Sequence, residues 1–344
     1  MPFGNGGDRS AGVGFHDMDG DGDVDLVVAN GRHWAGENRI HLNDGAGGIA
    51  GAIAFGTGAD RSYTARVADF DGDGRPDVVV GNDAGDVSRV YLNRGGGRFS
   101  TGAALGDASA PTRGLAIGDL DGDGDLDVFM VNRGAPNRIF FNDGKGAFPE
   151  SRVLGEASDA TISAAVGDLD GDGDLDLVVA NRKGQPNLFY LNDGAGGFEQ
   201  RFPYGPGNDE TRAVALADMD GNGHLDIVNG NIGGPNAIYY NDGGALFTTY
   251  SLFATPPSAT YAIAIADMNR DGRPDVVVGN RGHHNYVYFN DGSGEVSGPR
   301  PFGTPDGLTY DVAVGDFDGD GRPDIAVANS GGRNAVYLNA PAAP

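Results

Sequence analysis

The stretch Asp69-Phe70-Asp71-Gly72-Asp73-Gly74-Arg75-Pro76-Asp77 places carboxylates at positions 1, 3, 5 and 9 of a nine-residue loop. Acidic oxygens at alternate residues of a tight turn can converge on one hard cation, and Gly74 at position 6 permits the sharp bend. The main-chain carbonyl of Arg75, at position 7, can supply a further oxygen. This set of oxygen ligands predicts a calcium site.

The loop occurs seven times, and its first aspartates are 52, 50, 49, 50, 49 and 49 residues apart. A period of this kind indicates one repeated supersecondary unit. We therefore expect up to seven Ca²⁺ ions, one per repeat. Magnesium fits less well, because it prefers rigid octahedral sites with several waters. We call these segments the acidic loops, and their expected metal ligands are Asp17, Asp19, Asp21 and Asp25; Asp69, Asp71, Asp73 and Asp77; Asp119, Asp121, Asp123 and Asp127; Asp168, Asp170, Asp172 and Asp176; Asp218, Asp220, Asn222 and Asp226; Asp267, Asn269, Asp271 and Asp275; and Asp316, Asp318, Asp320 and Asp324.

The residues on either side of the acidic loops predict strands. An EF-hand needs a glutamate at position 12 and flanking helices, whereas position 12 is Val80 in the stretch quoted above. The β-branched run Asp77-Val78-Val79-Val80 indicates a buried strand after a loop, and Ala213-Val214-Ala215-Leu216-Ala217 indicates one before a loop. Each acidic loop therefore joins two antiparallel strands.

Two further strands complete each repeat. A third strand alternates, as in Val90-Tyr91-Leu92-Asn93, and a turn such as Asn142-Asp143-Gly144 leads to a fourth. Four strands in each of seven repeats predict an all-β, seven-bladed β-propeller that forms a single domain over residues 1–344. The expected blades are residues 8–56, 57–106, 107–155, 156–205, 206–254, 255–303, and 304–339 together with 1–4.

The repeat register also predicts how the ring closes. An aromatic residue or leucine stands fourteen residues before each first aspartate, and Met1-Pro2-Phe3-Gly4 matches the end of a fourth strand without a blade before it. The last repeat stops after its third strand, at Asn339. The N-terminal strand should therefore become the outermost strand of the last blade.

The chain resembles the FG-GAP/VCBS repeat proteins, which include the integrin α-subunit head and certain fungal and bacterial propeller lectins. The resemblance rests on the seven acidic loops and on the pairs Phe3-Gly4, Phe55-Gly56 and Phe302-Gly303. It implies a calcium-bound seven-bladed propeller. It does not choose a ligand, because such propellers serve as lectins, adhesion receptors, lyase scaffolds and surface proteins.

Composition excludes several classes of partner. The formal net charge is −25, so a phosphate backbone would be repelled and nucleic acid is not expected as a partner. No apolar run is long enough to span a membrane. The absence of cysteine removes thiol and disulfide chemistry. Open calcium sites fill where calcium is plentiful, which favours an extracellular or periplasmic location; no signal peptide is visible at Met1, so a leader has been removed or the protein stays inside.

Candidate ligand residues lie on the face opposite the acidic loops. Five of the seven loops that follow the second strands carry arginine, although the chain has few cations. These arginines predict either a surface for an acidic or hydroxyl-rich ligand or a rim of ion pairs with neighbouring aspartates. The candidates on this face are Trp34, Arg32, Arg133, Arg182, Arg281 and His283.

A second candidate region lies at the ring axis. Small residues occupy the innermost strands in most repeats, but Arg66 and Asp311 break this rule, and Tyr310 precedes Asp311. A charge near the axis needs a partner. The three residues predict either an axial ligand pocket or, as the favoured alternative, an internal salt bridge between Arg66 and Asp311.

Asparagines bracket the third strand in nearly every repeat, for example Asn137 and Asn142. We expect them to cap turns and bond to local backbone, with contact to a repeated ligand as the alternative.

The leading hypothesis for function is a calcium-stabilised, non-enzymatic module that binds a carbohydrate or a protein surface ligand. The alternative is an enzyme with an axial pocket that binds a small molecule, such as a polysaccharide lyase or a small-molecule cyclase or isomerase. No nucleophile–base motif such as Gly-x-Ser-x-Gly is present to support it. A structural or engineered scaffold is the third hypothesis.

Overall fold

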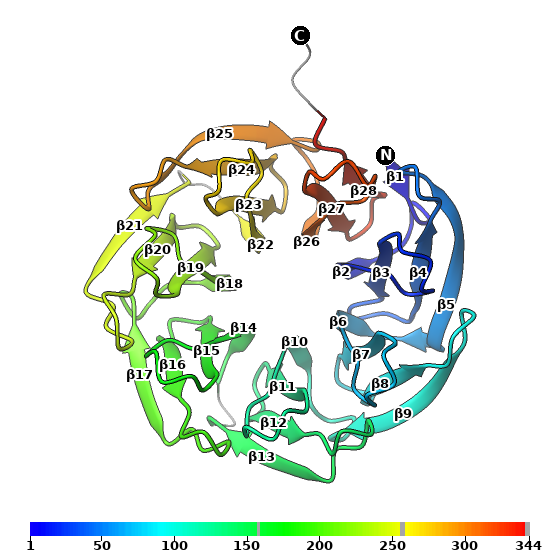
Figure 1. Cartoon of the computed structure of the whole chain (residues 1–344), viewed down its shortest axis with the longest axis horizontal. Helices are drawn as coiled ribbons and strands as arrows, with labels where there is room; N and C mark the ends of the chain where they lie inside the picture. Colours follow the sequence, from blue (N-terminus) through cyan, green and yellow to red (C-terminus); the bar gives the residue numbers. More distant parts are fainter. Residues whose placement is uncertain (157–158, 255–258, 341–344) are drawn as a thin grey trace.

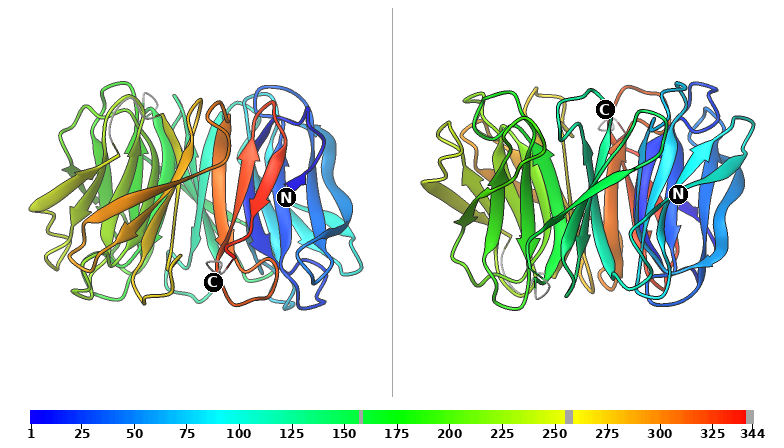
Figure 2. Two further views of the ribbon diagram at one scale, coloured as in Figure 1. Left: turned by 90° about the horizontal axis from the view of Figure 1, so that it is seen from above. Right: turned by 90° about the horizontal axis from the view of Figure 1, so that it is seen from below.

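The computed structural model describes residues 1–156, 159–254 and 259–340. The described chain forms 28 strands in seven four-stranded antiparallel sheets, arranged as blades around a central axis (Figure 1). Figure 2 shows the strands running between the two faces of this short cylinder. The predicted seven-bladed β-propeller is confirmed.

The strands of the first four blades follow one another from the axis outwards. Blade 1 contains β2 (Ser10–His16), β3 (Asp25–Asn30), β4 (Gly36–Asn43) and β5 (Ile49–Asp60). Blade 2 contains β6 (Ser62–Ala68), β7 (Asp77–Asn82), β8 (Ser88–Asn93) and β9 (Phe99–Leu105). Blade 3 contains β10 (Thr112–Gly118), β11 (Asp127–Asn132), β12 (Asn137–Phe141) and β13 (Glu150–Leu154). Blade 4 contains β14 (Thr161–Gly167), β15 (Asp176–Asn181), β16 (Asn187–Leu191) and β17 (Gln200–Tyr204).

The remaining blades keep this order until the chain ends. Blade 5 contains β18 (Thr211–Ala217), β19 (Asp226–Asn231), β20 (Asn236–Tyr240) and β21 (Thr249–Phe253). Blade 6 contains β22 (Thr260–Ala266), β23 (Asp275–Asn280), β24 (Asn285–Asn290) and β25 (Val296–Phe302). Blade 7 contains β26 (Thr309–Gly315), β27 (Asp324–Asn329), β28 (Asn334–Tyr337) and β1 (Pro2–Phe3). Within the described ranges there is no helix long and apolar enough to cross a lipid bilayer.

The hydrophobic core lies between blades. The second strand of each blade is buried along nearly its whole length, because its β-branched residues face a neighbouring blade on each side. One core cluster, for example, joins Phe70 and Val79 of blade 2 to Leu115 and Met130 of blade 3. The apolar contacts are therefore made in layers around the ring, and the axis itself is left for a channel.

A ring of hydrogen bonds joins the blades on the side of the acidic loops. Asn142, which follows the third strand of blade 3, donates from Nδ2 to the carbonyl of Phe70 in the acidic loop of blade 2, at 2.9 Å. The same bond recurs in all the other blades, from Asn43 to Phe317, Asn93 to Met18, Asn192 to Leu120, Asn241 to Leu169, Asn290 to Met219 and Asn339 to Met268. The predicted bond to local backbone is present, since Asn142 Nδ2 also donates to the carbonyl of Leu126 at 3.2 Å, but the sequence did not predict the bond to the preceding blade.

A second set of asparagines joins the blades on the opposite side. Asn187 donates from Nδ2 to the hydroxyl of Thr211 in the next blade at 2.8 Å, and Thr211 donates to Asn231 at 2.9 Å. Thr211 is fully buried, so both bonds are made away from water. The repeated asparagines thus link neighbouring blades at both ends of the strands.

The N-terminal strand closes the ring, as predicted. Strand β1 pairs antiparallel with β28, with Pro2 opposite Ala335 and Phe3 opposite Asn334. Phe3 is 5% exposed and packs in a cluster that contains Val13 and Leu26. Because β1 has only two residues, we infer that the buried Phe3 ring supplies most of its attachment.

The substitution Phe3→Ala should destabilise the ring at its closure. Loss of a buried phenylalanine costs about 3 to 5 kcal/mol, and in this position it also releases β1 from β28. We expect a lower melting temperature together with faster amide hydrogen exchange in β28. Phe55→Ala removes the equivalent ring from the long strand β5 and should lower stability without affecting exchange in β28. An unchanged melting temperature for Phe3→Ala would show that the N-terminal strand does not hold the ring.

Candidate functional site

The acidic loops bring three carboxylates together. In five loops, one ligand atom from each of the aspartates at positions 1, 3 and 9 lies within 4.8 Å of the others. The five groups are Asp17, Asp19 and Asp25; Asp69, Asp71 and Asp77; Asp119, Asp121 and Asp127; Asp168, Asp170 and Asp176; and Asp218, Asp220 and Asp226. A sixth group of acidic or histidine side chains is also present among the described residues. All the ligand atoms of the five groups are oxygens, which suit a hard cation.

The shape of the loop comes from its own backbone. Gly74 adopts a φ of 83°, where an L side chain would be strained, and its N–H donates to Asp69 Oδ2 at 2.8 Å. The ninth residue, Asp77, is fully buried and accepts the N–H of Phe70 at 3.0 Å and that of Asn93 at 2.7 Å. The carboxylates are thus held in place by the turn itself.

Unsatisfied oxygens in the loops fit a bound cation. Oδ1 of Asp71, Asp121 and Asp316 is buried and has no hydrogen-bond donor among the described residues. A buried carboxylate oxygen without a partner carries a desolvation cost of about 1 to 3 kcal/mol or more. Burial, with smaller contributions from Asp71 and Asp73, also raises the pKa of Asp77 to about 6. A divalent cation would supply the missing partner and offset the repulsion.

The fifth-position carboxylates behave differently from the other three. They are absent from the five groups of converging oxygens named above. Asp271, at position 5 in blade 6, forms an ion pair with Arg273 at 2.5 Å, and Asp73 pairs with Arg75 in the same way. An arginine at position 7 can therefore compete with a cation for this carboxylate.

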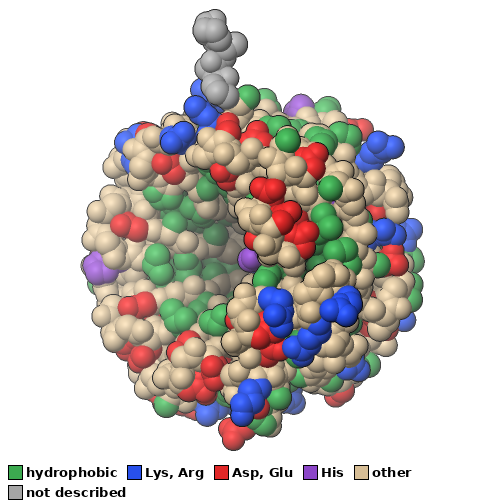
Figure 3. All heavy atoms as spheres, turned by 45° about the vertical axis from the view of Figure 1, so that its right-hand side comes forward, with side chains coloured by type: hydrophobic (Ala, Val, Ile, Leu, Met, Phe, Trp, Pro, Cys, Tyr) green, Lys and Arg blue, Asp and Glu red, His purple; other side chains and the backbone are tan. Residues whose placement is uncertain are grey.

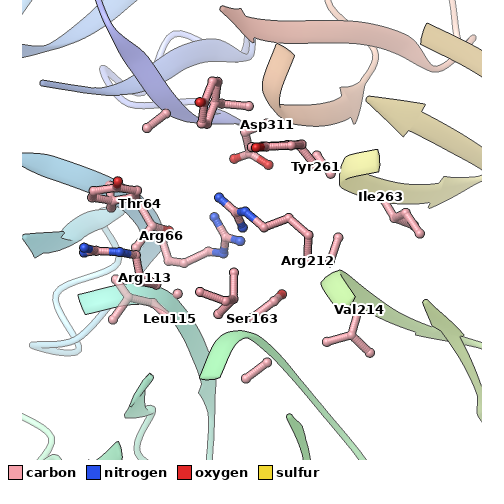
Figure 4. Close-up of a pocket in the computed structure, with 18 residues that line it drawn as sticks. Thr64, Arg66, Arg113, Leu115, Ser163, Arg212, Val214, Tyr261, Ile263 and Asp311 are labelled. Atoms are coloured by element: carbon pink, nitrogen blue, oxygen red, sulfur yellow. The ribbon is translucent and has the colours of Figure 1, made fainter. Parts of the chain in front are cut away.

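A pocket opens in the axial channel. Figure 3 shows the central hollow of the ring, with hydrophobic side chains on its wall and acidic side chains grouped around it. The pocket has a volume of about 80 Å³, and Arg66, Tyr310 and Asp311 all line it (Figure 4). The structure thus brings together the three residues that the sequence places near the axis.

The salt bridge favoured from the sequence is not formed. Arg66 and Asp311 do not come within 4.0 Å as an ion pair. Asp311 instead accepts the N–H groups of Val13 and Val312, each at 3.1 Å, and Arg66 donates to the carbonyl of Ala65 at 2.9 Å. The two side chains come from blades 2 and 7, on either side of blade 1, and whether they meet depends on how the ring closes, which repeat position alone does not give.

The pocket wall contains a ring of seven equivalent residues. The residue six before each first aspartate faces the channel, and these residues are Ala11, Tyr63, Arg113, Ile162, Arg212, Tyr261 and Tyr310. Of this ring the sequence singled out only Tyr310 as a site residue. Aligning the repeats at this position would have revealed two arginines and three tyrosines at one level of the channel.

The tyrosines of this ring stack against arginines. Arg113 lies 4.0 Å from the ring centroid of Tyr63, and Arg32 lies 3.9 Å from that of Tyr310. Arg212 and Arg281 lie 5.3 and 6.0 Å from the centroid of Tyr261. Cation–π contacts of this kind fix the orientation of guanidinium groups. The candidates Arg32 and Arg281 therefore belong to the mouth of the channel.

Trp34 lies beside the same mouth. Its ring is 49% exposed, and Arg9 covers one side at 3.6 Å from the centroid. The neighbouring His33 contacts Asp83 through Nδ1 at 2.6 Å and the hydroxyl of Tyr63 through Nε2, also at 2.6 Å. Trp34 thus caps a hydrogen-bonded network and keeps part of its surface in solvent.

The other candidates on this face lie outside the pocket. Arg182 forms an ion pair with Glu210 at 2.9 Å. This pair fits the alternative prediction that the arginines of this face form ion pairs with neighbouring acidic residues. Arg133 is half-buried and His283 is exposed. Among the described residues, the axial pocket is not lined by Arg133, Arg182 or His283.

Two grooves lie between neighbouring blades at the same repeat positions. The groove between blades 4 and 5 has a volume of about 380 Å³ and is lined by Gly205, Asn231 and Tyr239. The groove between blades 6 and 7 has a volume of about 470 Å³ and is lined by the equivalent residues Gly303, Asn329 and Tyr337. Repeated shallow grooves are suited to binding more than one copy of a ligand group.

Asp83 provides a test of the network beneath Trp34. Its side chain is 12% exposed and pairs at 2.7 Å with Arg113, which is 8% exposed. Burial raises the pKa of Asp83, but hydrogen bonds from His33 and Arg113 outweigh it and hold the pKa below 3.8. Asp83→Asn should therefore lower the free energy of unfolding by roughly 3 kcal/mol at neutral pH, because it leaves Arg113 buried without its counter-charge.

The effect of Asp83→Asn should depend on pH in a defined direction. A lowered pKa stabilises the fold above 3.8, and this contribution is lost as the pH falls below that value. Urea unfolding of both proteins should therefore show a difference that shrinks below pH 3.8. Asp86→Asn, which alters a more exposed pair with Arg61, should cost less than about 1 kcal/mol at any pH. Equal effects of the two substitutions would contradict this account.

Comparisons with known proteins agree with this architecture. A search of curated proteins finds no match. Among solved structures, BP39L lectin from Burkholderia pseudomallei is 18% identical, covers 95% of each chain and has a TM-score of 0.71. A lectin from Agrocybe aegerita that recognises non-reducing terminal N-acetylglucosamine is 21% identical, covers 86% of this chain and 80% of its own, and has a TM-score of 0.60. BBS1N, solved in complex with ARL6DN, is 13% identical, covers 97% and 94% of the two chains, and has a TM-score of 0.65.

A profile of the FG-GAP-like repeat matches the sequence six times in overlapping segments. The matched residues are 17–80, 69–130, 119–179, 168–229, 218–278 and 267–327. The segments begin at the first aspartates of six acidic loops and together span most of the chain. The protein therefore belongs to the FG-GAP-like repeat family.

Proposed function

We propose that this protein is a calcium-stabilised binding module whose ligand is a carbohydrate, held on the face opposite the acidic loops. The observation that carries the proposal is the pair of equivalent grooves between blades. The likeness in fold to two lectins supports it. The module would act by presenting surfaces of a rigid ring, and calcium would maintain that ring.

The groove between blades 4 and 5 combines the groups that sugars need. Tyr250 and Leu252 are exposed there at 63% and 58%, and the apolar C–H face of a sugar ring can pack on such surfaces. Asp209, Tyr239 and Thr249 supply polar oxygens to the same groove for contact with hydroxyl groups. A few polar groups set among apolar ones is the usual composition of a ligand site.

The second groove is a weaker version of the first. It keeps the equivalent of Tyr239, which is Tyr337, but the outermost strand of blade 7 is the two-residue β1, which places no residue opposite Tyr337 and adds no aromatic side chain to the groove. The groove between blades 4 and 5 should therefore bind the sugar more tightly. Two sites on one rigid ring would raise the apparent affinity for a ligand that carries several copies of the sugar.

Calcium is the metal that the acidic loops suit. Their converging oxygens include buried atoms without hydrogen-bond donors, and bound Ca²⁺ would satisfy these atoms while removing repulsion between carboxylates. The backbone carbonyls of the same loops accept the interblade hydrogen bonds, so a fixed loop also fixes the neighbouring blade. We further propose an extracellular or periplasmic location, because calcium is plentiful there.

Removal of calcium should destabilise the protein. A chelator such as EGTA should lower the melting temperature markedly, and added Ca²⁺ should restore it, because a cation that binds only the folded state stabilises it by mass action. Asp121→Asn should reduce by one the number of ions bound, measured by elemental analysis after gel filtration. Asp125→Asn changes the carboxylate at position 7, where the carbonyl is the expected ligand, and should leave this number unchanged. A melting temperature that changes with neither EGTA nor calcium would contradict the proposed role of the metal.

Tyr250→Ala should weaken sugar binding by about tenfold, since exposed aromatic anchors contribute more than about 1 kcal/mol in binding sites. A glycan array with the calcium-loaded protein identifies the sugar, and calorimetry gives the affinity. Leu246→Ala removes an equally exposed apolar side chain outside the groove and should have no effect. Loss of binding with Trp34→Ala but not with Tyr250→Ala would move the site to the channel mouth. An array without any bound glycan would overturn the proposal.

A further inference from the structure

We propose that the axial pocket is a binding site for a small oxyanion, such as a carboxylate or sulfate group, held between Arg66 and Arg212. This site is separate from the grooves between blades and does not depend on the proposed carbohydrate site there. The argument rests on charge, on hydrogen-bonding capacity and on the shape of the pocket.

The pocket gathers positive charge in an acidic protein. Although the chain has a formal net charge of −25, the pocket is lined by Arg66, Arg113 and Arg212 and by one carboxylate, Asp311. Arg113 is neutralised by Asp83 at 2.7 Å. Arg66 and Arg212 make no ion pair within 4.0 Å with any described residue. Two guanidinium groups therefore share the pocket with a single acid.

Asp311 accepts no hydrogen bond from either of these two guanidinium groups. Its two oxygens accept the backbone N–H groups of Val13 and Val312, at 3.1 Å each. Figure 4 shows Arg66 and Arg212 extending from different blades toward the middle of the pocket, near Asp311. Arg66 donates one hydrogen bond to the carbonyl of Ala65, and Arg212 donates none to a described residue. Most of the ten N–H donors of the pair, five on each guanidinium, remain available.

Arg212 is the residue whose charge most needs a counter-ion. It is partly buried at the mouth, and burial lowers its pKa, while Asp311 and the neighbouring tyrosines oppose this only in part. A guanidinium nevertheless stays charged in proteins, so the cost of desolvation persists until an anion approaches. An oxyanion beside Arg212 would offset that cost.

The pocket selects ligands by size and geometry. Its volume of about 80 Å³ holds only several water-sized groups, since a single water needs roughly 10–15 Å³. A planar guanidinium pairs in a two-pronged way with carboxylate or sulfate oxygens. At the mouth, Arg32 and Arg281 stack on Tyr310 and Tyr261 and add to the positive field that leads into the channel. The anion can be free, or it can be the charged group of an acidic sugar whose ring stays at the mouth.

Calorimetry with two anions tests the site. Sodium sulfate and sodium glucuronate are titrated into the calcium-loaded protein at constant ionic strength in chloride, with methyl glucoside as the uncharged comparison. We expect both anions to bind and methyl glucoside to fail to bind in the pocket. If neither anion binds, the proposal is overturned. Equal affinities would indicate a site for free anions, whereas a clear preference for glucuronate would assign the acidic sugar as the source.

Matched substitutions locate the binding. Arg66→Gln and Arg212→Gln should each weaken anion binding by about tenfold or more, the loss expected for a hydrogen bond between charged groups. Arg300→Gln, on the outermost strand β25, makes the same change of charge away from the channel and should have no effect. Arg66 is exposed in the channel, so its substitution tests binding without threatening the fold even if Arg212→Gln unfolds. Anion affinity that is unchanged in Arg66→Gln would refute the site.

Asp311→Asn provides a test in the opposite direction. Removing the one carboxylate of the pocket should strengthen sulfate binding several-fold, because a like charge no longer faces the anion. If Asp311 only stabilised the structure, its substitution would weaken sulfate binding or leave it unaltered. Weaker sulfate binding by a folded Asp311→Asn protein would therefore contradict the proposed geometry.

Discussion

The buried aspartate at position 9 of each acidic loop is the group on which the ring depends. In blade 3, Asp127 accepts the N–H of Leu120 at 2.9 Å from its own loop and that of Asn142 at 2.8 Å from the third strand. Asn142 in turn bonds to the carbonyl of Phe70 in blade 2. One carboxylate thus fixes the loop, the third strand and the contact with the neighbouring blade. Burial raises the pKa of Asp127 to about 7. The ionised carboxylate is therefore costly to bury in the absence of a cation, and a bound cation would offset that cost.

This arrangement leaves two places free for function. Because the apolar contacts form layers between blades, the core does not fill the axis, and because the acidic loops occupy one face, the other face is open to variation. The axial pocket and the grooves lie in these two places. Proteins of the same fold can therefore bind different ligands while the acidic loops stay nearly identical.

The two sites differ in how they use the repeat. The grooves reuse equivalent residues, such as Tyr239 and Tyr337, so they favour ligands with repeated groups. The axial pocket does the reverse: seven equivalent positions converge on one space, and their differences give it its charge. Arg113 and Arg212 stand where Ala11 and Ile162 stand in other blades.

The sequence by itself determined the propeller, the closure by Phe3 and the convergence of aspartates in the loops, because these features depend on short-range spacing repeated at a fixed period. It also singled out Arg66 and Asp311, since each breaks the repeat. Only the tertiary structure decided that these two residues are not paired, that Arg212 joins them and that Trp34 lies under Arg9. Arg66, Arg212 and Asp311 belong to blades far apart in the chain, and their distances depend on how seven blades close around one axis; the contact between Trp34 and Arg9 depends on how two irregular loops of one repeat fold against each other.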